Sequence, residues 1–207
     1  VGLINMPTAR FYPESSYGIT IYDGTPDQKI TMTSAPIDWL EASFFYTNIQ
    51  GLPYPGYEYQ DYKDKGFNVK VRLKEQGTLP AIAIGINDLA GTGFYSGEYL
   101  VGSYEYNKLD FHLGLGWGSL NGKNDFRNPL TFIDERFKNR PKKFEDEGGQ
   151  FQPSRYFSDE DISIFFGLSY LINDKTLFKF ERDTTKTDGL IDYQDPESSY
   201  SFGFEYK

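Results

Sequence analysis

The stretch Phe67-Asn68-Val69-Lys70-Val71-Arg72-Leu73-Lys74 alternates apolar and polar residues without a break. Successive side chains of a β-strand point to opposite faces, so this pattern predicts a strand with one apolar and one strongly polar face. Helical periodicity is almost absent elsewhere in the chain. The same alternation recurs in nine further segments, at residues 17–21, 30–32, 40–46, 82–86, 95–106, 109–117, 162–170, 176–183 and 200–206. The sequence therefore predicts an all-β antiparallel fold of about ten strands.

The composition favours a membrane barrel among all-β folds. Aromatic residues make up 18% of the 207 residues, a large share for a soluble domain. The polar strand faces repeatedly carry glycine, which weakens a strand that faces water but relieves crowding inside a barrel. No run approaches the roughly 18–20 consecutive apolar residues of a membrane-spanning helix. We therefore expect an antiparallel transmembrane β-barrel, with the polar faces in its lumen, or a segment of a larger barrel.

Charge and cysteine content exclude several functions. The absence of cysteine removes disulfide scaffolds, thiol catalysis and cysteine-based zinc sites. A net charge of -9 argues against a nucleic-acid partner. Acidic residues Asp183, Asp188, Asp192, Asp195 and Glu197 match no calcium-loop spacing and are interpreted as solvated loop residues. We predict no metal and no cofactor. The start at Val1, without a leader, predicts a mature or excised chain.

The predicted connections alternate in length. Short turns at residues 34–37, 75–78, 106–108 and 172–174 alternate with longer loops at 48–64, 88–93, 119–160 and 184–198. Outer-membrane barrels have short periplasmic turns and long extracellular loops. We therefore expect one barrel domain over residues 1–207, with residues 119–160 as a long extracellular loop and both termini in the periplasm.

Aromatic residues near the predicted strand ends are candidates for the membrane interfaces. Tyrosine and tryptophan form girdles where a barrel meets the lipid headgroups. The alternative is that these rings close the ends of a soluble β core. The candidates are Trp39, Tyr46, Trp117, Tyr170 and Tyr206.

An ordered series of short motifs runs through roughly the first 118 residues and fades after Gly118. They are Gly2-Leu3-Ile4, Pro7-Thr8-Ala9-Arg10, Asp23-Gly24, residues 60–66, Arg72, Pro80-Ala81, residues 83–88, 91–94, Ser96, residues 98–101, Asp110-Phe111 and residues 113–118. This series resembles the YjbH-type family of bacterial exopolysaccharide-biosynthesis outer-membrane proteins, whose members are commonly much longer. The resemblance implies an outer-membrane barrel that takes part in polysaccharide export without catalytic activity. The implied partners are outer-membrane lipid, a polysaccharide and other proteins of an exopolysaccharide locus.

Charged residues on the predicted polar faces are candidates for the lumen. Lys70, Arg72 and Lys74 form a basic ladder on one strand, and Asp88, Glu98 and Asp110 fall on the next three strands. Opposite charges on neighbouring strands pair to satisfy buried charge. The alternative is that they select or contact a sugar.

His112 is the single histidine and shares a strand face with Asp110. One interpretation is a polar lumen residue. The other is a membrane-embedded hydrolase in which Ser163 or Ser169 supplies the hydroxyl, although no nucleophile motif is present.

Four tyrosines crowd the region before the basic strand, at Tyr54, Tyr57, Tyr59 and Tyr62. Flat rings with hydroxyl groups suit the apolar faces and hydroxyl edges of sugars. The alternative is that these rings pack on neighbouring loops and close the mouth.

The function expected from the sequence is non-enzymatic exopolysaccharide export or secretion in the outer membrane of a Gram-negative bacterium. A general porin-like channel for small solutes is the first alternative, and an outer-membrane lipid hydrolase that uses His112 is the second. A soluble carbohydrate-binding module is a further one, if the apolar faces pack on one another.

Overall fold

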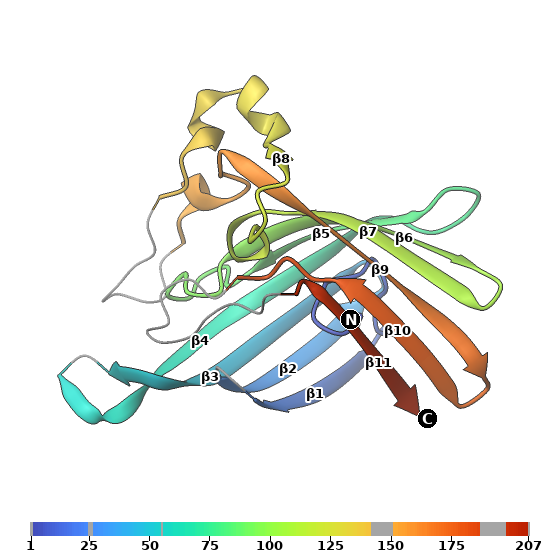
Figure 1. Ribbon diagram of the computed structural model, residues 1–207, viewed down its shortest axis with the longest axis horizontal. Coiled ribbons are helices and arrows are strands. Elements are labelled where there is room, and N and C mark those ends of the chain that lie inside the picture. Colours follow the sequence, from blue (N-terminus) through green and yellow to red (C-terminus); the bar gives the residue numbers. More distant parts are fainter. Residues whose placement is uncertain (1, 25–26, 55, 142–150, 187–197, 207) are drawn as a thin grey trace.

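The computed structural model describes residues 2–24, 27–54, 56–141, 151–186 and 198–206 (Figure 1). The strands are β1 (Ser16–Asp23), β2 (Asp27–Ile37), β3 (Leu40–Tyr54), β4 (Tyr57–Lys74), β5 (Ala81–Asn87), β6 (Gly97–Tyr106), β7 (Leu109–Gly116), β8 (Phe126–Arg127), β9 (Asp161–Asn173), β10 (Thr176–Arg182) and β11 (Tyr200–Tyr206). Four 3-10 helices are η1 (Gly118–Leu120), η2 (Pro129–Phe132), η3 (Glu135–Lys138) and η4 (Pro153–Arg155). None of the described helices is long and apolar enough to cross a bilayer.

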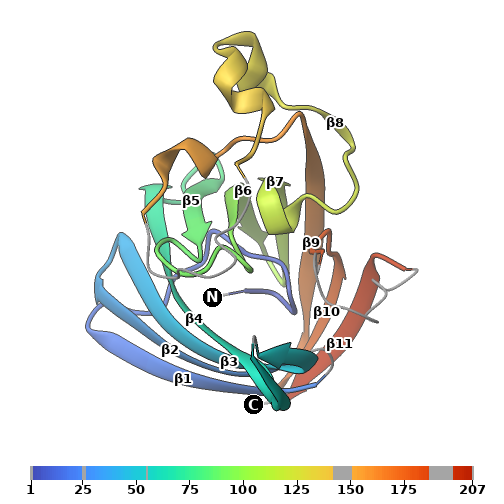
Figure 2. The same cartoon turned by 90° about the vertical axis from the view of Figure 1, so that its left-hand side faces the viewer.

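The strands form a single antiparallel sheet in sequence order, in which β7 pairs directly with β9 and the two-residue β8 pairs with β9 outside this path. Ten strands lie on the path, so the predicted all-β antiparallel class is confirmed. The sheet curves into an open arc (Figure 2). Within the described residues β1 and β11 are not paired with each other, so the closed barrel, one of the two forms expected from the sequence, is not observed.

The convex face of the sheet is apolar. The register aligns Ile19 of β1 with Met32 of β2, Met32 with Phe44 of β3, and Phe44 with Phe67 of β4. All four side chains are exposed, and the rings of Phe44 and Phe67 lie 5.4 Å apart. At the other end of the sheet β11 exposes Phe202 and Phe204 in the same way. Many large apolar side chains of these strands thus lie outside the fold, whereas Phe45 and Ile49 of β3 are buried.

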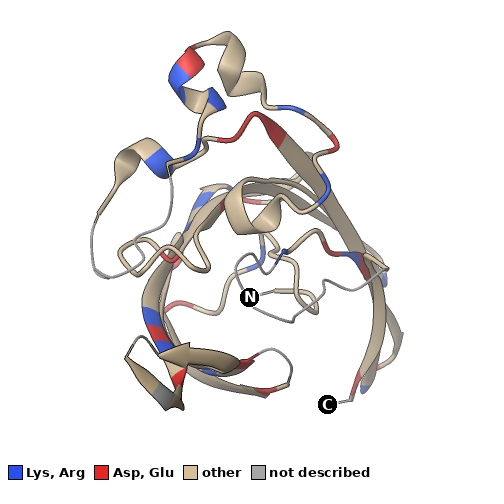
Figure 3. Ribbon diagram, turned by 60° about the vertical axis from the view of Figure 1, so that its left-hand side comes forward, with Lys and Arg blue, Asp and Glu red and all other residues tan. Residues whose placement is uncertain are grey.

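The concave face is polar, and much of it is buried. Its buried charged and polar residues are Asp27, Glu41, Thr47, Asp64, Lys70, Ser103, His112, Ser169 and Glu181. Basic and acidic residues lie close together along the strands of the sheet (Figure 3). Two inward glycines make room for rings, because a Cβ at Gly85 would lie 2.2 Å from the Tyr99 ring, and one at Gly114 would lie 2.2 Å from the Phe165 ring. The predicted use of glycine on the polar faces is confirmed at both positions.

The N-terminal segment (residues 2–13) runs through the space that the sheet encloses (Figure 2). Its apolar side chains Leu3, Met6 and Ala9 meet those of Ala81, Ala83, Tyr99, Val101, Leu120 and Phe165 in a small buried core. Burial of apolar surface contributes about 25 cal/mol per Å², so this core helps to hold the segment. The sequence predicted which side chains of the strands point inward, but not that the N-terminal segment occupies the enclosed space.

Two predicted loops differ from the observed structure. Residues 48–64 were expected to be a loop, but they form the ends of β3 and β4, and this hairpin projects beyond the rest of the sheet (Figure 1). Aromatic residues favour strands when they pair across a ladder, and this hairpin is rich in them. The predicted loop 119–160 is folded where described. With Gly118 it forms the 118–160 region, which contains β8 and four 3-10 helices, of which η1 and η4 lie near the ends of β5–β7 (Figure 2).

Candidate functional site

Glu181 of β10 anchors the start of the N-terminal segment. Its carboxylate accepts hydrogen bonds from the backbone N–H groups of Ile4 (2.9 Å), Asn5 (2.9 Å) and Met6 (3.3 Å). Glu181 is fully buried. Lys179, two residues earlier on the same face, donates from Nζ to the carbonyl oxygen of Leu3 at 3.0 Å. One face of β10 therefore satisfies the backbone polar groups of a segment that has no regular structure of its own.

A buried ion pair holds the other end of the N-terminal segment. Lys70 Nζ of β4 lies 3.1 Å from Glu41 Oε1 of β3 and donates to the carbonyl oxygen of Arg10 at 2.7 Å. Glu41 in turn accepts the backbone N–H of Tyr12 at 3.2 Å. The Lys70 ammonium also lies 4.4 Å from the centre of the Phe11 ring, a cation–π distance. Lys70, predicted as a lumen charge, does face the enclosed space, but its partners are Glu41 and the N-terminal segment.

Asp110 binds the side chain of Arg10. The Arg10 guanidinium donates from Nε at 2.9 Å and from Nη2 at 2.6 Å to the two oxygens of Asp110, which is a bidentate pair. Nη2 also donates to Gln76 Oε1 at 2.7 Å. The predicted lumen acid Asp110 therefore holds the N-terminal segment from β7.

His112 lies between Ser103 and Asp110. Its Nδ1 lies 2.8 Å from Ser103 Oγ, and its Nε2 lies 3.7 Å from Asp110 Oδ2. Ser103 Oγ also accepts the backbone N–H of Ala9 at 2.9 Å, and both side chains are buried under the N-terminal segment. Ser163, one of the two serines considered for a hydrolase, bonds instead to Asn121 at 2.8 Å. Ser103, the partner of His112, contacts the N-terminal segment at Ala9. This contact favours the interpretation of His112 as a polar lumen residue.

Glu98 lies on the convex face of the sheet and not in the lumen as expected. It pairs in register with Ile86, which lies on the opposite face of β5 from the inward Ala83, and it alternates with the inward Tyr99. The Arg140 guanidinium covers it, with Nη1 2.8 Å and Nη2 2.9 Å from its two oxygens, and the Phe157 N–H donates to it at 2.8 Å. Glu98 was assigned to the lumen because it is charged, but it lies on an otherwise apolar face. The folded 118–160 region satisfies this charge.

The other members of the basic ladder lie near the short turns. Arg72 pairs with Glu75 at 2.8 Å, and Lys74 is exposed at the end of β4. Within the described residues, no ion pair joins Lys70, Arg72 or Lys74 to Asp88, Glu98 or Asp110. The predicted pairing between these two groups is therefore not observed. Lys70, Glu98 and Asp110 instead find partners on another strand, in the 118–160 region or in the N-terminal segment.

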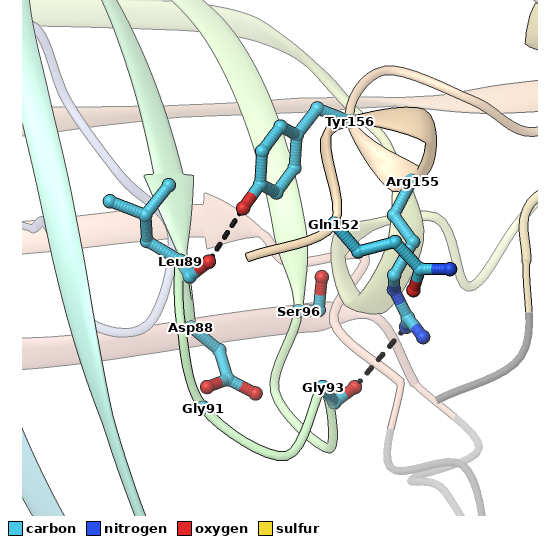
Figure 4. A pocket seen from close by; sticks show the side chains of 8 residues that line it. All are labelled: Asp88, Leu89, Gly91, Gly93, Ser96, Gln152, Arg155 and Tyr156. Carbon is cyan, nitrogen blue, oxygen red and sulfur yellow. Dashed lines mark hydrogen bonds between the residues drawn. The ribbon is translucent and has the colours of Figure 1, made fainter. Parts of the chain in front are cut away.

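Asp88 is buried at the rim, in the turn after β5 (Figure 4). Burial and the nearby charge of Asp64 raise the pKa of its carboxyl group to about 7. Its Oδ2 accepts the backbone N–H of Tyr95 at 3.2 Å. Arg155 and Tyr156 reach over the same turn from η4 and the residue after it, and the Tyr156 hydroxyl donates to the carbonyl oxygen of Leu89 at 2.5 Å. The turn after β5 and the 118–160 region thus meet around a carboxyl group that titrates near neutral pH.

Replacing Asp88 with Asn is expected to remove a pH dependence of stability. A folded-state pKa of about 7, against roughly 3.9 for an unfolded Asp, means that the folded state holds this proton between these values while the unfolded state loses it. The free energy of unfolding of the wild type should therefore fall as pH rises from about 4 to 7, by up to about 1.4 kcal/mol per pH unit.

Urea unfolding at pH 5 and pH 8 in detergent micelles measures this effect. The difference between the two pH values should shrink in Asp88→Asn and persist in the control Asp38→Asn, which alters an exposed carboxylate in the β2–β3 turn. Equal pH dependence in wild type and Asp88→Asn would show that Asp88 does not hold a proton in the folded state.

An aromatic row lines the rim next to the projecting hairpin. We define it as Tyr57, Tyr54, Tyr62, Phe94, Tyr95 and Phe45, in the order of their contacts. Successive ring centres lie 6.2, 5.7, 5.9, 6.0 and 5.6 Å apart. Three of the four predicted tyrosines belong to this row, whereas Tyr59 projects alone and is fully exposed. Sequence reasoning missed Phe45, Phe94 and Tyr95, although Phe94 and Tyr95 are an adjacent aromatic pair between the predicted loop 88–93 and the predicted strand 95–106.

The predicted girdle residues have different surroundings. Trp39, Tyr46, Tyr170 and Tyr206 are all exposed, and Trp39 lies in the β2–β3 turn. Trp117 differs, because it is buried with its ring 5.2 Å from that of Phe157, under the 118–160 region. It therefore does not reach the outer surface. Most residues of the acidic cluster around Asp188–Glu197 lie outside the described residues, and the described residues contain no group of ligands that suits a metal ion.

The fold and the site together define an all-β antiparallel sheet protein, apolar outside, whose polar concave face binds its own N-terminal segment. Residues 1–207 match the family described as exopolysaccharide biosynthesis protein YbjH (YjbH). A relative from Escherichia coli (strain K12), named "Uncharacterized lipoprotein YjbH", is 34% identical over 175 residues, which are 82% of this chain and 25% of the relative. The chain belongs to the YjbH family.

These comparisons extend the resemblance seen in the sequence. The family match covers the whole chain, including the part after Gly118 where the motifs fade. The chain spans about a quarter of the length of the E. coli relative. No solved structure matches the chain significantly.

Proposed function

We propose that this chain forms part of the wall of an outer-membrane β-barrel that takes part in exopolysaccharide export or secretion, without catalysing a reaction. The observation that carries this proposal is the inverted distribution of side chains, in which Ile19, Met32 and Phe44 are exposed on the convex face while Glu41, Lys70 and Glu181 are buried on the concave face. A water-soluble sheet buries its apolar face, whereas a barrel in lipid presents it.

The orientation proposed for this barrel places both termini in the periplasm. β1 begins and β11 ends at the edge of the sheet that carries the turns after β2 and β9, which have only two residues each. The projecting β3–β4 hairpin and the 118–160 region lie at the opposite edge. Short periplasmic turns and larger extracellular connections are typical of outer-membrane barrels. The E. coli relative is named a lipoprotein, which agrees with association with a membrane.

The aromatic row and the filled interior favour polysaccharide handling over free diffusion. Successive rings about 6 Å apart offer flat apolar surfaces on which sugar rings stack, and the tyrosine hydroxyls offer hydrogen bonds. The N-terminal segment occupies much of the enclosed space, so a general porin-like channel is the weaker proposal. The family description also names exopolysaccharide biosynthesis. Other proteins of the same locus are the proposed partners.

Secretion by cells that carry a Tyr54→Ala/Tyr62→Ala variant tests this function. The double variant removes the stacked pair at the centre of the row, and we expect secreted polysaccharide to fall several-fold while the amount of protein in the outer-membrane fraction stays unchanged. Base–aromatic stacking in other proteins contributes about 1–3 kcal/mol per ring, and a sugar contact of even the lower value gives such an effect.

Tyr59→Ala is the matched control, because it removes an exposed ring from the same hairpin outside the row. Its secretion should equal that of the wild type. Recovery of the protein from the soluble fraction without detergent, or unchanged secretion by the correctly localised double variant, would refute the proposal.

A further inference from the structure

A polar cavity of about 250 Å³ lies between the N-terminal segment and the inner face of β1–β5. Its walls include the hydroxyl groups of Tyr12, Thr33 and Ser43 and the amide groups of Asn68 and Asn87, and the ring of Tyr99 borders it. Six elements of the fold contribute these groups, from the N-terminal segment to β6. The cavity therefore exists only when the sheet and the segment are assembled.

We propose that this cavity is a binding site for one neutral sugar unit of a saccharide. The inference rests on the proposed role in exopolysaccharide handling and names a site for that ligand. Hydroxyl and amide groups both donate and accept hydrogen bonds, which is what the hydroxyl groups of a sugar require.

The volume limits the ligand to a small one. Pockets for drug-sized molecules measure roughly 300–1,000 Å³, and this cavity is smaller. Binding is favoured when a ligand with matching hydroxyl groups displaces weakly held waters. One sugar ring with its hydroxyl groups is a ligand of this size.

The charge of the walls favours a neutral sugar over an acidic one. Among the described residues, Glu41 and Lys70 are the charged ones that line the cavity, and they form an ion pair at 3.1 Å. The Lys70 ammonium also binds the carbonyl oxygen of Arg10. Because the positive charge is already compensated, a uronic acid carboxylate would have to be desolvated without gaining a new partner. The cavity should therefore discriminate against acidic sugars.

The cavity and the aromatic row share one strand, β3. Ser43 lines the cavity, and Phe45, the inner end of the row, lies two residues further along the same inward face of β3. Thr33 Oγ1 lies 3.0 Å from Ser43 Oγ, so the two hydroxyls form one polar patch across β2 and β3. In this proposal, a saccharide that stacks on the row lies near the groups that bind the hydroxyls of a sugar unit.

Saturation-transfer NMR on the protein in a detergent without a sugar headgroup tests this site. The probes are methyl α-glucoside, methyl α-galactoside and methyl glucuronide. We expect transfer to at least one neutral glycoside at millimolar concentration, and a signal at least several-fold weaker for the glucuronide. Asn87→Leu fills the cavity and removes an amide, so it should reduce the neutral signal several-fold. Thr33→Val removes one hydroxyl with little change in shape and should reduce it less.

Two controls separate this site from other effects. Ser169→Ala removes a hydroxyl from the concave side of β9, away from the cavity, and should leave the signal unchanged. The Tyr54→Ala/Tyr62→Ala variant should keep the cavity signal even where it reduces secretion, so failure of this site and failure of the proposed function are distinguishable. Absence of transfer to every neutral probe, equal transfer in folded Asn87→Leu, or equal transfer to the glucuronide would overturn the inference.

Discussion

Replacing Glu181 with Ala is expected to lower the free energy of unfolding by about 3 kcal/mol or more and to free the N-terminal segment. The carboxylate of Glu181 accepts the N–H groups of Ile4, Asn5 and Met6, and Met6 is fully buried. The buried Met6 donor that loses its acceptor costs roughly 1–3 kcal/mol, and the partly buried Ile4 and Asn5 donors add to this cost. The apolar contacts of Leu3 and Met6 depend on the same anchoring, so they weaken together with it.

Two measurements follow this change. Urea unfolding in detergent micelles gives the loss of stability, and limited trypsin digestion reports cleavage after Arg10, which Asp110 and Gln76 hold in the wild type. Cleavage should become at least ten-fold faster in the variant. Glu181→Gln keeps one acceptor oxygen, so its stability and its rate of cleavage should lie between those of the wild type and of Glu181→Ala.

Glu75→Ala is the matched control for Glu181. It removes a carboxylate that pairs with Arg72 at the exposed end of β4, and exposed pairs contribute about 0.2–1 kcal/mol. If Glu181→Ala costs no more than this control, the N-terminal segment is not held by the concave face.

Replacing Met32 with Arg is expected to destabilise the protein in lipid vesicles by about 2–4 kcal/mol, because a charged side chain on the lipid face costs this much near the bilayer midplane. Met32 is the central residue of β2, points to the convex face and is 54% exposed. In a protein surrounded by water an exposed Met→Arg change is usually worth less than about 0.5 kcal/mol in either direction. The two environments therefore predict clearly different results.

Gln28→Arg is the control for depth, because Gln28 lies on the same face of β2 but at the end of the strand. Its cost should be at most about 1 kcal/mol, as expected near the interface. The measurement is the free energy of unfolding by urea from vesicles. Equal, small effects of both substitutions would contradict a lipid-facing convex surface.

The sequence was sufficient for the class of the sheet and for most of its faces. Strict alternation such as Phe67-Asn68-Val69-Lys70 encodes which side chains share a face, and the structure places Phe67 outside and Lys70 inside. Alternation is a local signal with a period of two residues, so it needs no knowledge of tertiary contacts. The tyrosines of the hairpin could also be predicted from a local signal, because they lie close together in the sequence.

Partners across the fold were not predictable in the same way. Glu98 was assigned to the lumen because it is charged, but Arg140, 42 residues later, covers it on the convex face. The N-terminal segment has no alternation, and its place depends on groups such as Glu181 that lie about 175 residues away. No local pattern encodes such distant hydrogen bonds, which form only after the sheet has set the geometry.

A nitroxide scan along β2 in lipid vesicles tests the central claim most directly. The chain contains no cysteine, so single cysteines at residues 28–34 can each carry one label. If the convex face meets lipid and the concave face is filled, collision with oxygen should peak at Ile30 and Met32 and fall at Lys29, Thr31 and Thr33, while a water-soluble nickel complex reaches Ile30 and Met32 least. Access of the nickel complex to Ile30 and Met32 equal to that at the exposed turn residue Asp38 would contradict the account.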